Sequence, residues 1–509
     1  MSAHPIILPL LPALLISACY GQHRASVSHA EDGRPNIILV ITDDQGYGDL
    51  GCHGHPFLKT PNLDKLHAHS TRFTDFHTSP TCAPTRGALM SGKAPFKVGI
   101  THTIYERERM ALSATTIAEV LQDAGYATGI FGKWHLGEDD AYQPENRGFD
   151  EVFIHGAGGI GQVYPGSQAD VPGNSYFDPV LKHNDTFVQS EGYCTDVFFQ
   201  QALAWIREKK DEQPFFAYIS TNAPHRPFIA PDDYAALYAE LCDQVPEAQR
   251  DEVVHFLGMI TNIDDNMGLL MEKLEAWQLA NKTVLIFMTD NGTARGDYIF
   301  NAGMRGRKAT KYGGATRVPF FVRYPGLTTA GVDVDRFARH YDIYPTLAAF
   351  AGADLPDNLD LDGRSLLPLL QDPEAQWDDR LSFFHLGRWS EKGQGIHSTP
   401  PFEPDGAKYQ NFAVRSQAWR LVGSIKNDPD TPRLELYHIA EDAGEEKNLI
   451  AEHPGRAQAM LAAYDDWWDA VRPLMINEDA PLDVEKQYLG NYEKQKADSG
   501  IPTWAPPEL

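Results

Sequence analysis

A short segment, CAPTRGALMSGK at residues 82–93, combines a thiol with cationic and small side chains. The fixed φ of Pro84 suits the first turn of a helix, which puts Cys82 at or just before a helix N-terminus. Free backbone N–H groups at such an end attract an anion, and Arg86 adds a fork of donors beside them. We therefore expect Cys82 to face a tetrahedral oxyanion, although an unmodified thiol is a poor group for attacking one.

A second set of side chains offers oxygen ligands only. Asp43 and Asp44 follow one hydrophobic run, and Asp290 and Asn291 follow another. If these segments meet, the three carboxylates repel and raise one another's pKa unless a cation lies between them. Oxygen ligands suit a hard divalent ion such as Ca²⁺, with Mg²⁺ as the smaller alternative.

Four continuous hydrophobic runs are predicted to be buried strands, because such runs are typical of strands covered on both faces. Each is followed by polar or ionisable residues: run 36–42 by Asp43-Asp44, run 127–131 by Lys133 and His135, run 215–220 by His225, and run 284–289 by Asp290-Asn291. In an open α/β sheet, ligands bind just beyond the carboxyl ends of the strands. We therefore expect the four polar clusters to converge at one edge of a sheet.

The order of the predicted elements indicates the fold class. Strands alternate with helical patterns, such as the one at residues 116–124, so an α/β fold with a mostly parallel sheet between helices is expected. Short alternating segments and an amphipathic helix at about 454–471 predict a smaller α+β domain with an antiparallel sheet at the C-terminus. The predicted units are a catalytic domain at 34–375, the smaller domain at 376–472 and a polar tail at 473–509.

The composition limits the class of partner. The chain has 509 residues, of which 42% are hydrophobic and 22% charged, as in ordinary large globular proteins. A net charge of −26 without a basic stripe argues against nucleic acid as a partner. The same charge repels polyanions at long range, so an anionic substrate must be held by local cations and a metal.

The N-terminus resembles an export signal. The apolar run at residues 6–18 is too short to span a bilayer and contains prolines, as in a signal-peptide core, although it lacks a basic n-region. Residues 16–19, ISAC, resemble a bacterial lipobox that would leave Cys19 as a lipid-bearing first residue. Cleavage near Ala18 or Ala30 without lipidation is the alternative. We expect a protein that is periplasmic, anchored to the outer membrane or extracellular.

The other cysteines do not form a disulfide framework. Cys52, Cys194 and Cys242 are an odd set that allows at most one bridge, so we expect them to be free or buried.

The segment at 82–93 resembles the signature of the formylglycine-dependent sulfatases, the type I, arylsulfatase-like family of the alkaline phosphatase superfamily. In that family the cysteine is oxidised to an aldehyde, which hydrates to a geminal diol; one hydroxyl attacks sulfur and the other later expels the sulfate. The resemblance runs from Pro35 to about Leu449 and includes GKWHLG at residues 132–137. It implies an alkaline-phosphatase-like fold and a maturation enzyme that makes formylglycine from Cys82.

The resemblance also implies a metal set. Asp43, Asp44, Asp290 and Asn291 match the family's ligands, and one oxygen of the modified Cys82 would complete the coordination. Related two-zinc phosphodiesterases and phosphatases typically have Asp-His-Gly where residues 290–292 read Asp-Asn-Gly, because zinc favours imidazole nitrogen. The amide points to one Ca²⁺.

The resemblance also implies catalytic roles for the residues that match the family's motifs. Lys133 would hold the diol or a sulfate oxygen, and His135 would accept a proton as sulfate leaves. His225 would be the general acid for the departing alcohol. Lys308 would bridge sulfate and leaving group, and Arg86 would anchor the nucleophile.

One departure concerns Lys308. After this lysine the family usually has Tyr-Glu-Gly-Gly before an arginine, whereas residues 312–317 read YGGATR. Without the glutamate the register of the loop stays open, so Arg305, Arg307 and Lys311 are alternative candidates.

Together these motifs predict an exported sulfuric ester hydrolase that splits a sulfate monoester into alcohol and inorganic sulfate. By analogy the substrate is a sulfated carbohydrate. Specificity could come from the insertion at residues 155–187 or from the region of His385, Arg388 and Trp389, to which we assign no subsites. Two alternatives remain: a phosphonate or phosphate monoester hydrolase with the same nucleophile, and a lipoprotein that binds sulfated glycan without turnover.

Overall fold

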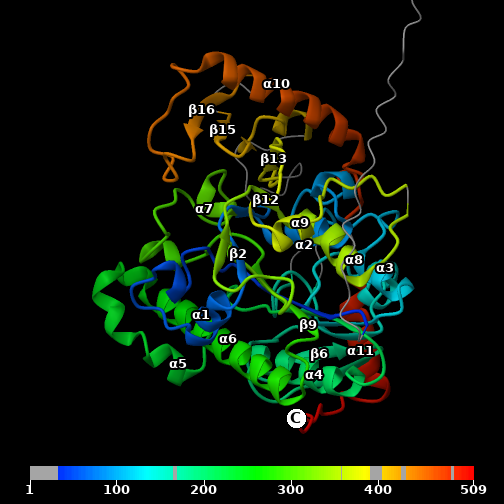
Figure 1. Cartoon of the computed structure of the whole chain (residues 1–509). Coiled ribbons are helices and arrows are strands. Elements are labelled where there is room, and N and C mark those ends of the chain that lie inside the picture. The colour runs from blue at the N-terminus through cyan, green and yellow to red at the C-terminus, as the bar shows by residue number, and fades with distance from the viewer. Residues whose placement is uncertain (1–32, 164–168, 357, 390–403, 426–430, 483–485) are drawn as a thin grey trace, which may run out of the picture.

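A mixed β-sheet lies at the centre of the molecule, with helices on both faces (Figure 1). The computed structural model describes residues 33–163, 169–356, 358–389, 404–425, 431–482 and 486–509. Within these residues, ten strands form the sheet in the order β11-β2-β10-β9-β1-β8-β4-β5-β6-β7. These strands are β1 (Asn36–Thr42), β2 (Thr71–Phe73), β4 (Ala127–Lys133), β5 (Glu151–His155), β6 (Val180–His183), β7 (Thr186–Gln189), β8 (Phe215–Ser220), β9 (Thr283–Thr289), β10 (Phe320–Arg323) and β11 (Val332–Val334).

The remaining elements surround this sheet. The helices are α1 (Pro61–Ala68), α2 (Cys82–Ser91), α3 (Ile117–Asp123), α4 (Cys194–Lys209), α5 (Asp232–Ala236), α6 (Arg250–Ala276), α7 (Gly313–Thr316), α8 (Ile343–Ala351), α9 (Leu367–Gln371), α10 (Pro454–Val471) and α11 (Gln487–Asp498). The other strands are β3 (Phe76–His77), β12 (Ala338–Arg339), β13 (Ser382–His385), β14 (Phe412–Arg415), β15 (Trp419–Ser424) and β16 (Arg433–His438).

Strand β1 shows why the central strands have continuous hydrophobic sequences. Ile37, Leu39 and Ile41 pack with side chains of α2, α3 and α8 on one face of the sheet. Ile38 and Val40 pack with α4 and α6 on the other face, and all five side chains are fully buried. Each such burial contributes about 1.5–3 kcal/mol to folding. The predicted α/β fold is confirmed.

The central strands are parallel, which fixes where their carboxyl ends lie. Strands β9, β1, β8, β4 and β5 run in the same direction. Strands β10 and β6 flank them in the antiparallel sense. The four predicted strands are confirmed, with β4 extending to Lys133. Their carboxyl ends therefore share one edge, as the sequence predicted.

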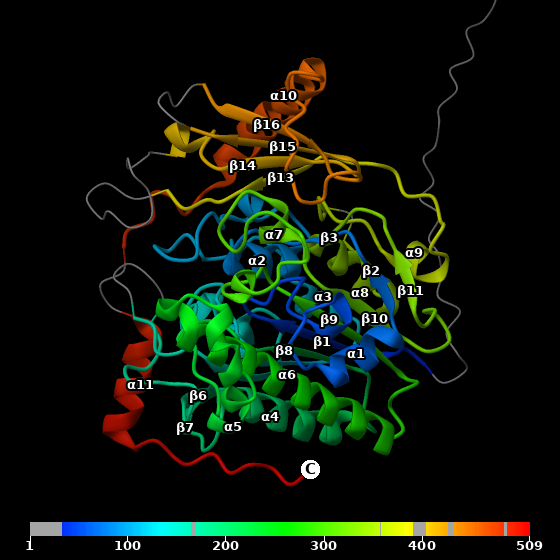
Figure 2. The ribbon, with the colours of Figure 1, turned by 90° about the vertical axis from the view of Figure 1, so that its left-hand side faces the viewer.

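A second, antiparallel sheet of order β13-β14-β15-β16 packs against α10. Figure 2 shows this unit stacked over α2 and α7. The predicted antiparallel sheet and the helix at 454–471 are confirmed. The domain boundary near residue 376 stays a prediction.

The predicted polar tail contains structure that the sequence pattern did not indicate. Tyr488 and Tyr492 of α11 pack against Phe187. Further on, the buried Trp504 contacts Phe153. Widely spaced aromatic side chains thus join this segment to the main sheet.

The N-terminal predictions fall on residues 1–30, which lie outside the described residues. In the described part, no helix is long and apolar enough to cross a membrane. Cys52, Cys82 and Cys194 carry free thiols. The side chain of Cys242 is also outside the description.

Candidate active site at the carboxyl edge of the sheet

The two acidic turns meet because β1 and β9 are adjacent and parallel. The last residues of the two strands are in register, so residues 43–44 and 290–291 leave the sheet side by side. The Asp44 N–H donates to Asp290 Oδ1 at 3.1 Å. Asp44 has a left-handed backbone with a φ of 71°, which turns the chain back over the edge. All four side chains are buried.

Each buried carboxylate of these turns is paired with one cation. Lys133 Nζ donates to Asp43 Oδ2 at 2.5 Å, Lys308 Nζ to Asp44 Oδ2 at 2.7 Å, and Arg86 to Asp290 Oδ2 at 2.9 Å. The charges of these three carboxylates and three cations cancel, so a bound divalent ion would give the cluster a net positive charge of two. Such a cluster favours an anionic substrate.

Burial and neighbouring charges shift these acids in opposite directions. Burial, followed by the Asp290 charge, raises the pKa of Asp43 well above its usual value. Burial also opposes ionisation of Asp44, but the Lys308 and His225 charges and the hydrogen bonds from Lys308 and Asn291 together hold the pKa of Asp44 below its usual value. Of these two carboxylates, Asp43 is the one whose ionised form a further cation would stabilise more.

The orientation of the oxygens fits a metal ion. Asp43 Oδ1 and Asn291 Oδ1 are buried and have no hydrogen-bond partner within the described residues. The Asn291 amide nitrogen donates to Asp44 Oδ1 at 3.0 Å, which fixes the amide with its oxygen free. Two unpartnered buried oxygens beside paired carboxylates are the donor set of a hard cation.

Cys82 lies at the same place. It is the first residue of α2, as the proline pattern predicted, and is 2% exposed. Ligand atoms of Asp43, Cys82 and Asp290 lie within 4.8 Å of one another. The sulfur therefore shares the edge of the sheet with the acidic turns.

Two histidines complete the surroundings of Cys82. His135 Nε2 lies 2.9 Å from the Thr103 carbonyl oxygen, and His135 Nδ1 is buried without a partner among the described residues. His225 Nδ1 lies 2.7 Å from the Arg226 carbonyl oxygen. Burial and the Lys133 charge lower the pKa of His135, and burial and the Lys308 charge lower that of His225. With a carbonyl accepting from one nitrogen, the other nitrogen of each ring is left for chemistry.

A cavity of about 500 Å³ opens over these groups. Its wall includes Asp44, Cys82, His135, His225 and Lys308. The other predicted site residues do not line the cavity but lie next to it, where the hydrogen bonds described above join them to one another and to the lining residue Asp44. These residues are Asp43, Asp290, Asn291, Lys133 and Arg86. All ten predicted site residues thus meet at one place.

Lys308 reaches the site although its loop departs from the family pattern. Its backbone N–H donates to the Thr293 carbonyl at 3.1 Å. A few residues later, the Gly313 N–H donates to the buried Glu445 carboxylate at 2.6 Å. A carboxylate from the C-terminal unit therefore fixes the loop.

The alternative cations have other partners. Arg305 stacks on Tyr312 and Lys311 lies over the same ring, while Arg307 lines the cavity but faces Asp297. Of these four basic residues, Lys308 is the one that contacts Asp44.

Comparisons with known proteins decide the family. The chain matches the sulfatase model over residues 35–353 and the model described as N-sulphoglucosamine sulphohydrolase, C-terminal, over residues 307–462. The chain is a member of the sulfatase family. This sulfatase is 30% identical to human arylsulfatase A over 456 residues, 84% of this chain and 86% of that protein. It is 30% identical to human N-acetylgalactosamine-6-sulfatase over 373 residues, 69% of this chain and 68% of that protein.

Solved structures agree on the fold. The sulfatase is similar to Ps i-CgsB in complex with k-i-k-neocarrahexaose, with a TM-score of 0.72, 25% identity and coverage of 92% of this chain and 98% of that chain. A phosphonate monoester hydrolase of Agrobacterium radiobacter shares the fold at a TM-score of 0.61 and 20% identity, covering 87% of this chain and 96% of that one. The predicted alkaline-phosphatase-like fold is confirmed, and the protein is a sulfuric ester hydrolase.

The glycine-rich insertion has a role that sequence reasoning did not assign. A Cβ on Gly158 would lie 2.4 Å from the His135 ring, and one on Gly159 would lie 2.9 Å from His225 Nδ1. The backbone of this loop therefore lies against both histidine rings, with no room for a side chain between them. The close approach of backbone to both histidines explains glycine at these two positions, and that approach is a property of the tertiary fold.

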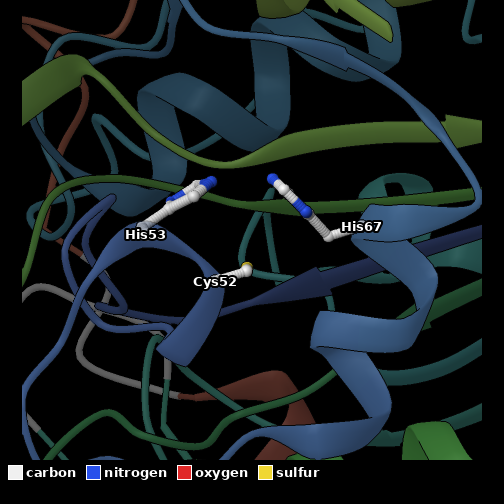
Figure 3. A group of neighbouring side chains, drawn as sticks. All are labelled: Cys52, His53 and His67. Atoms are coloured by element: carbon white, nitrogen blue, oxygen red, sulfur yellow. The ribbon is translucent and has the colours of Figure 1, made fainter. Parts of the chain in front are cut away.

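Cys52, His53 and His67 form another group that their spacing in the sequence did not reveal. Figure 3 shows the two rings pointing toward each other, with the Cys52 sulfur below the gap between them. Arg72 lies 3.3 Å from His67 Nδ1, a backbone carbonyl lies 2.6 Å from His53 Nδ1, and both rings meet Phe321 edge-on. Burial lowers the pKa of His53 to about 3. We interpret the group as aromatic packing and assign no metal to it.

The contact between Gly158 and His135 gives a first prediction. In Gly158→Ala the added methyl group must displace the His135 ring, so we expect kcat for a sulfate ester to fall by about tenfold or more. The matched control is Gly490→Ala, since a Cβ there meets nothing within 4 Å. Steady-state kinetics of the two variants provide the measurement. Equal kcat values would show that the loop does not position His135.

Proposed function

We propose that this sulfatase hydrolyses a sulfate monoester of a carbohydrate, using formylglycine made from Cys82 and one Ca²⁺ ion. The observation that carries the proposal is the place of Cys82, at a helix N-terminus within 4.8 Å of ligand atoms of Asp43 and Asp290. A cysteine so close to two buried carboxylates and three cations has the surroundings of a nucleophile that meets an anion.

The chemistry of the proposed groups fits the residues around them. Formylglycine supplies a hydrated aldehyde as nucleophile, and Ca²⁺ held by Asp43, Asp44, Asp290 and Asn291 supplies positive charge at the sulfate oxygens. Lys133 and Lys308 add donors on either side, already fixed by their carboxylate partners. Because the site is buried, these charges act with little screening by water.

The two histidines are suited to opposite proton transfers. In the neutral tautomer that donates from Nε2 to Thr103, His135 Nδ1 carries a lone pair and can accept a proton as sulfate leaves. His225 donates from Nδ1 to the Arg226 carbonyl, so only its doubly protonated form can give a proton from Nε2 to an alkoxide. The negative charge of a bound sulfate ester favours that form, against burial and Lys308, which disfavour it.

The proposed substrate class rests on the relatives. One human relative is an N-acetylgalactosamine-6-sulfatase, and one structural neighbour was solved with D-glucosamine-2-N,6-O-disulfate. We further propose export with a signal at residues 1–18 and maturation by a formylglycine-generating enzyme. The signal would be removed either before Cys19, which would then carry a lipid, or near Ala18 or Ala30 without lipidation.

The modification is tested on the protein isolated from its native host. Mass spectrometry of the tryptic peptide from Phe73 to Arg86 is expected to show an aldehyde in place of the Cys82 thiol. Cys82→Ala is expected to abolish hydrolysis of 4-nitrophenyl sulfate, while Cys52→Ala, a half-buried thiol outside the site, keeps it. An active protein with an intact Cys82 thiol contradicts the proposal. Faster hydrolysis of an aryl phosphonate than of the matched aryl sulfate would favour the phosphonate alternative.

Removal of metal gives another prediction. Ca²⁺ at 100 times its dissociation constant stabilises a native state by about 2.7 kcal/mol, so chelation is expected to lower both the melting temperature and the activity. Re-addition of Ca²⁺ restores both, and Mg²⁺ restores less because it demands a tighter octahedron. Calorimetry and activity assays of the chelated protein make the test. Unchanged values after complete chelation would argue against the site.

The role of His225 predicts a dependence on the leaving group. His225→Asn is expected to lower kcat for a sugar sulfate about 10²–10⁴-fold, because an alkoxide needs a proton to depart. The loss for 4-nitrophenyl sulfate should be much smaller, since nitrophenolate leaves without one. Equal losses on both substrates would mean that His225 binds rather than protonates.

A further inference from the structure

Arg388 is presented to the cavity by a rigid piece of the C-terminal unit. A Cβ on the preceding Gly387 would lie 1.7 Å from the Thr101 carbonyl oxygen, so the chain passes there in tight contact. The following Trp389 is fully buried, and its indole N–H donates to Glu478 at 2.8 Å. The backbone on both sides of Arg388 is therefore fixed, and its side chain lines the same cavity as Cys82.

The guanidinium of Arg388 has no acidic partner in the part of the chain that the structure describes. Its one hydrogen bond there is to the Thr103 hydroxyl at 3.4 Å, and its Nε is buried without a partner. Burial lowers the pKa of Arg388, and electrostatic interactions with Cys82 and Asp44 of the site oppose that shift only in part. A half-buried cation that the protein leaves unpaired costs stability unless a ligand pairs with it.

The other arginines of the cavity differ from Arg388 in this respect. Arg295 donates to Glu252 at 2.6 Å, and Arg226 lies 3.7 Å from the same carboxylate. Arg307 faces Asp297 at 3.4 Å. Among the arginines that line the cavity, Arg388 is thus the one whose charge the described protein does not neutralise.

Thr103 links Arg388 to the catalytic surroundings. Its hydroxyl accepts from Arg388, and its carbonyl lies 2.9 Å from His135 Nε2. The space beside Arg388 is therefore next to the place where the scissile sulfate would lie.

We propose that Arg388 binds a second anionic group of the substrate, a sulfate or carboxylate close to the scissile sulfate. The inference rests on the proposed function and narrows its substrate class to esters that carry two neighbouring negative charges. A fixed guanidinium presents two parallel N–H donors, which match the two oxygens of a carboxylate or sulfate group.

The test compares two chromogenic esters that differ by one charge. These are 4-nitrophenyl sulfate and 2-carboxy-4-nitrophenyl sulfate, whose carboxylate lies next to the sulfate. The ratio of their kcat/KM values is measured in the matured enzyme and in Arg388→Gln, so that differences in intrinsic reactivity cancel. We expect the ratio of carboxylated to plain ester to fall about tenfold or more in the variant, as loss of a charge-assisted hydrogen bond implies.

The control is Arg307→Gln, which removes the same charge from the same cavity but from a side chain that already has an acidic partner. Its ratio is expected to change much less. An equal fall of both kcat/KM values in Arg388→Gln, or no change in either, would overturn the inference while leaving the sulfatase function in place. A matured wild-type enzyme that hydrolyses neither ester, nor any sugar sulfate, would instead overturn the proposed function.

Discussion

The parallel pairing of β1 with β9 is the constraint on which the rest of the site depends. It brings three carboxylates together at a buried edge, where they could not remain without compensation. Lys133 from β4, Lys308 from a loop and Arg86 from α2 each neutralise one of them. Electrostatic balance thus holds five separate segments of the chain together at one point.

The same balance connects the two parts of the molecule. Glu445 of the C-terminal unit fixes the loop that carries Lys308, and the neighbouring Arg420 lies 3.6 Å from that glutamate. Arg388 enters the cavity from the same unit. The C-terminal unit therefore contributes Arg388 to the wall of the candidate site and fixes the loop that carries Lys308.

How far the sequence predicts this structure depends on the type of feature. The central strands and the start of α2 follow from local patterns, since a run such as 36–42 must be covered on both faces and Pro84 suits only the first turn of a helix. Seven of the ten site residues follow predicted parallel strands, whose carboxyl ends have to converge at one edge of the sheet. The other three, Cys82, Arg86 and Lys308, are identified from the resemblance of their motifs to the family.

Other features depend on contacts between distant segments and leave no local pattern. Thr103 contributes a carbonyl oxygen, which any residue offers. Gly158 is required by the His135 ring, and the insertion alone does not reveal which side chain it approaches. The fixed backbone around Arg388 depends on Thr101 and Glu478, both remote in sequence.

The burial of α2 sets an order of events for the whole protein. All ten residues of this helix are buried, so a second enzyme could not bind the CAPTR segment as an extended peptide once the sheet and helices have closed around it. Any conversion of the Cys82 side chain must then take place on a chain that is still unfolded. Under the proposed function, formylglycine would therefore form before folding is complete, and a molecule that folds too early would keep an unmodified Cys82 thiol.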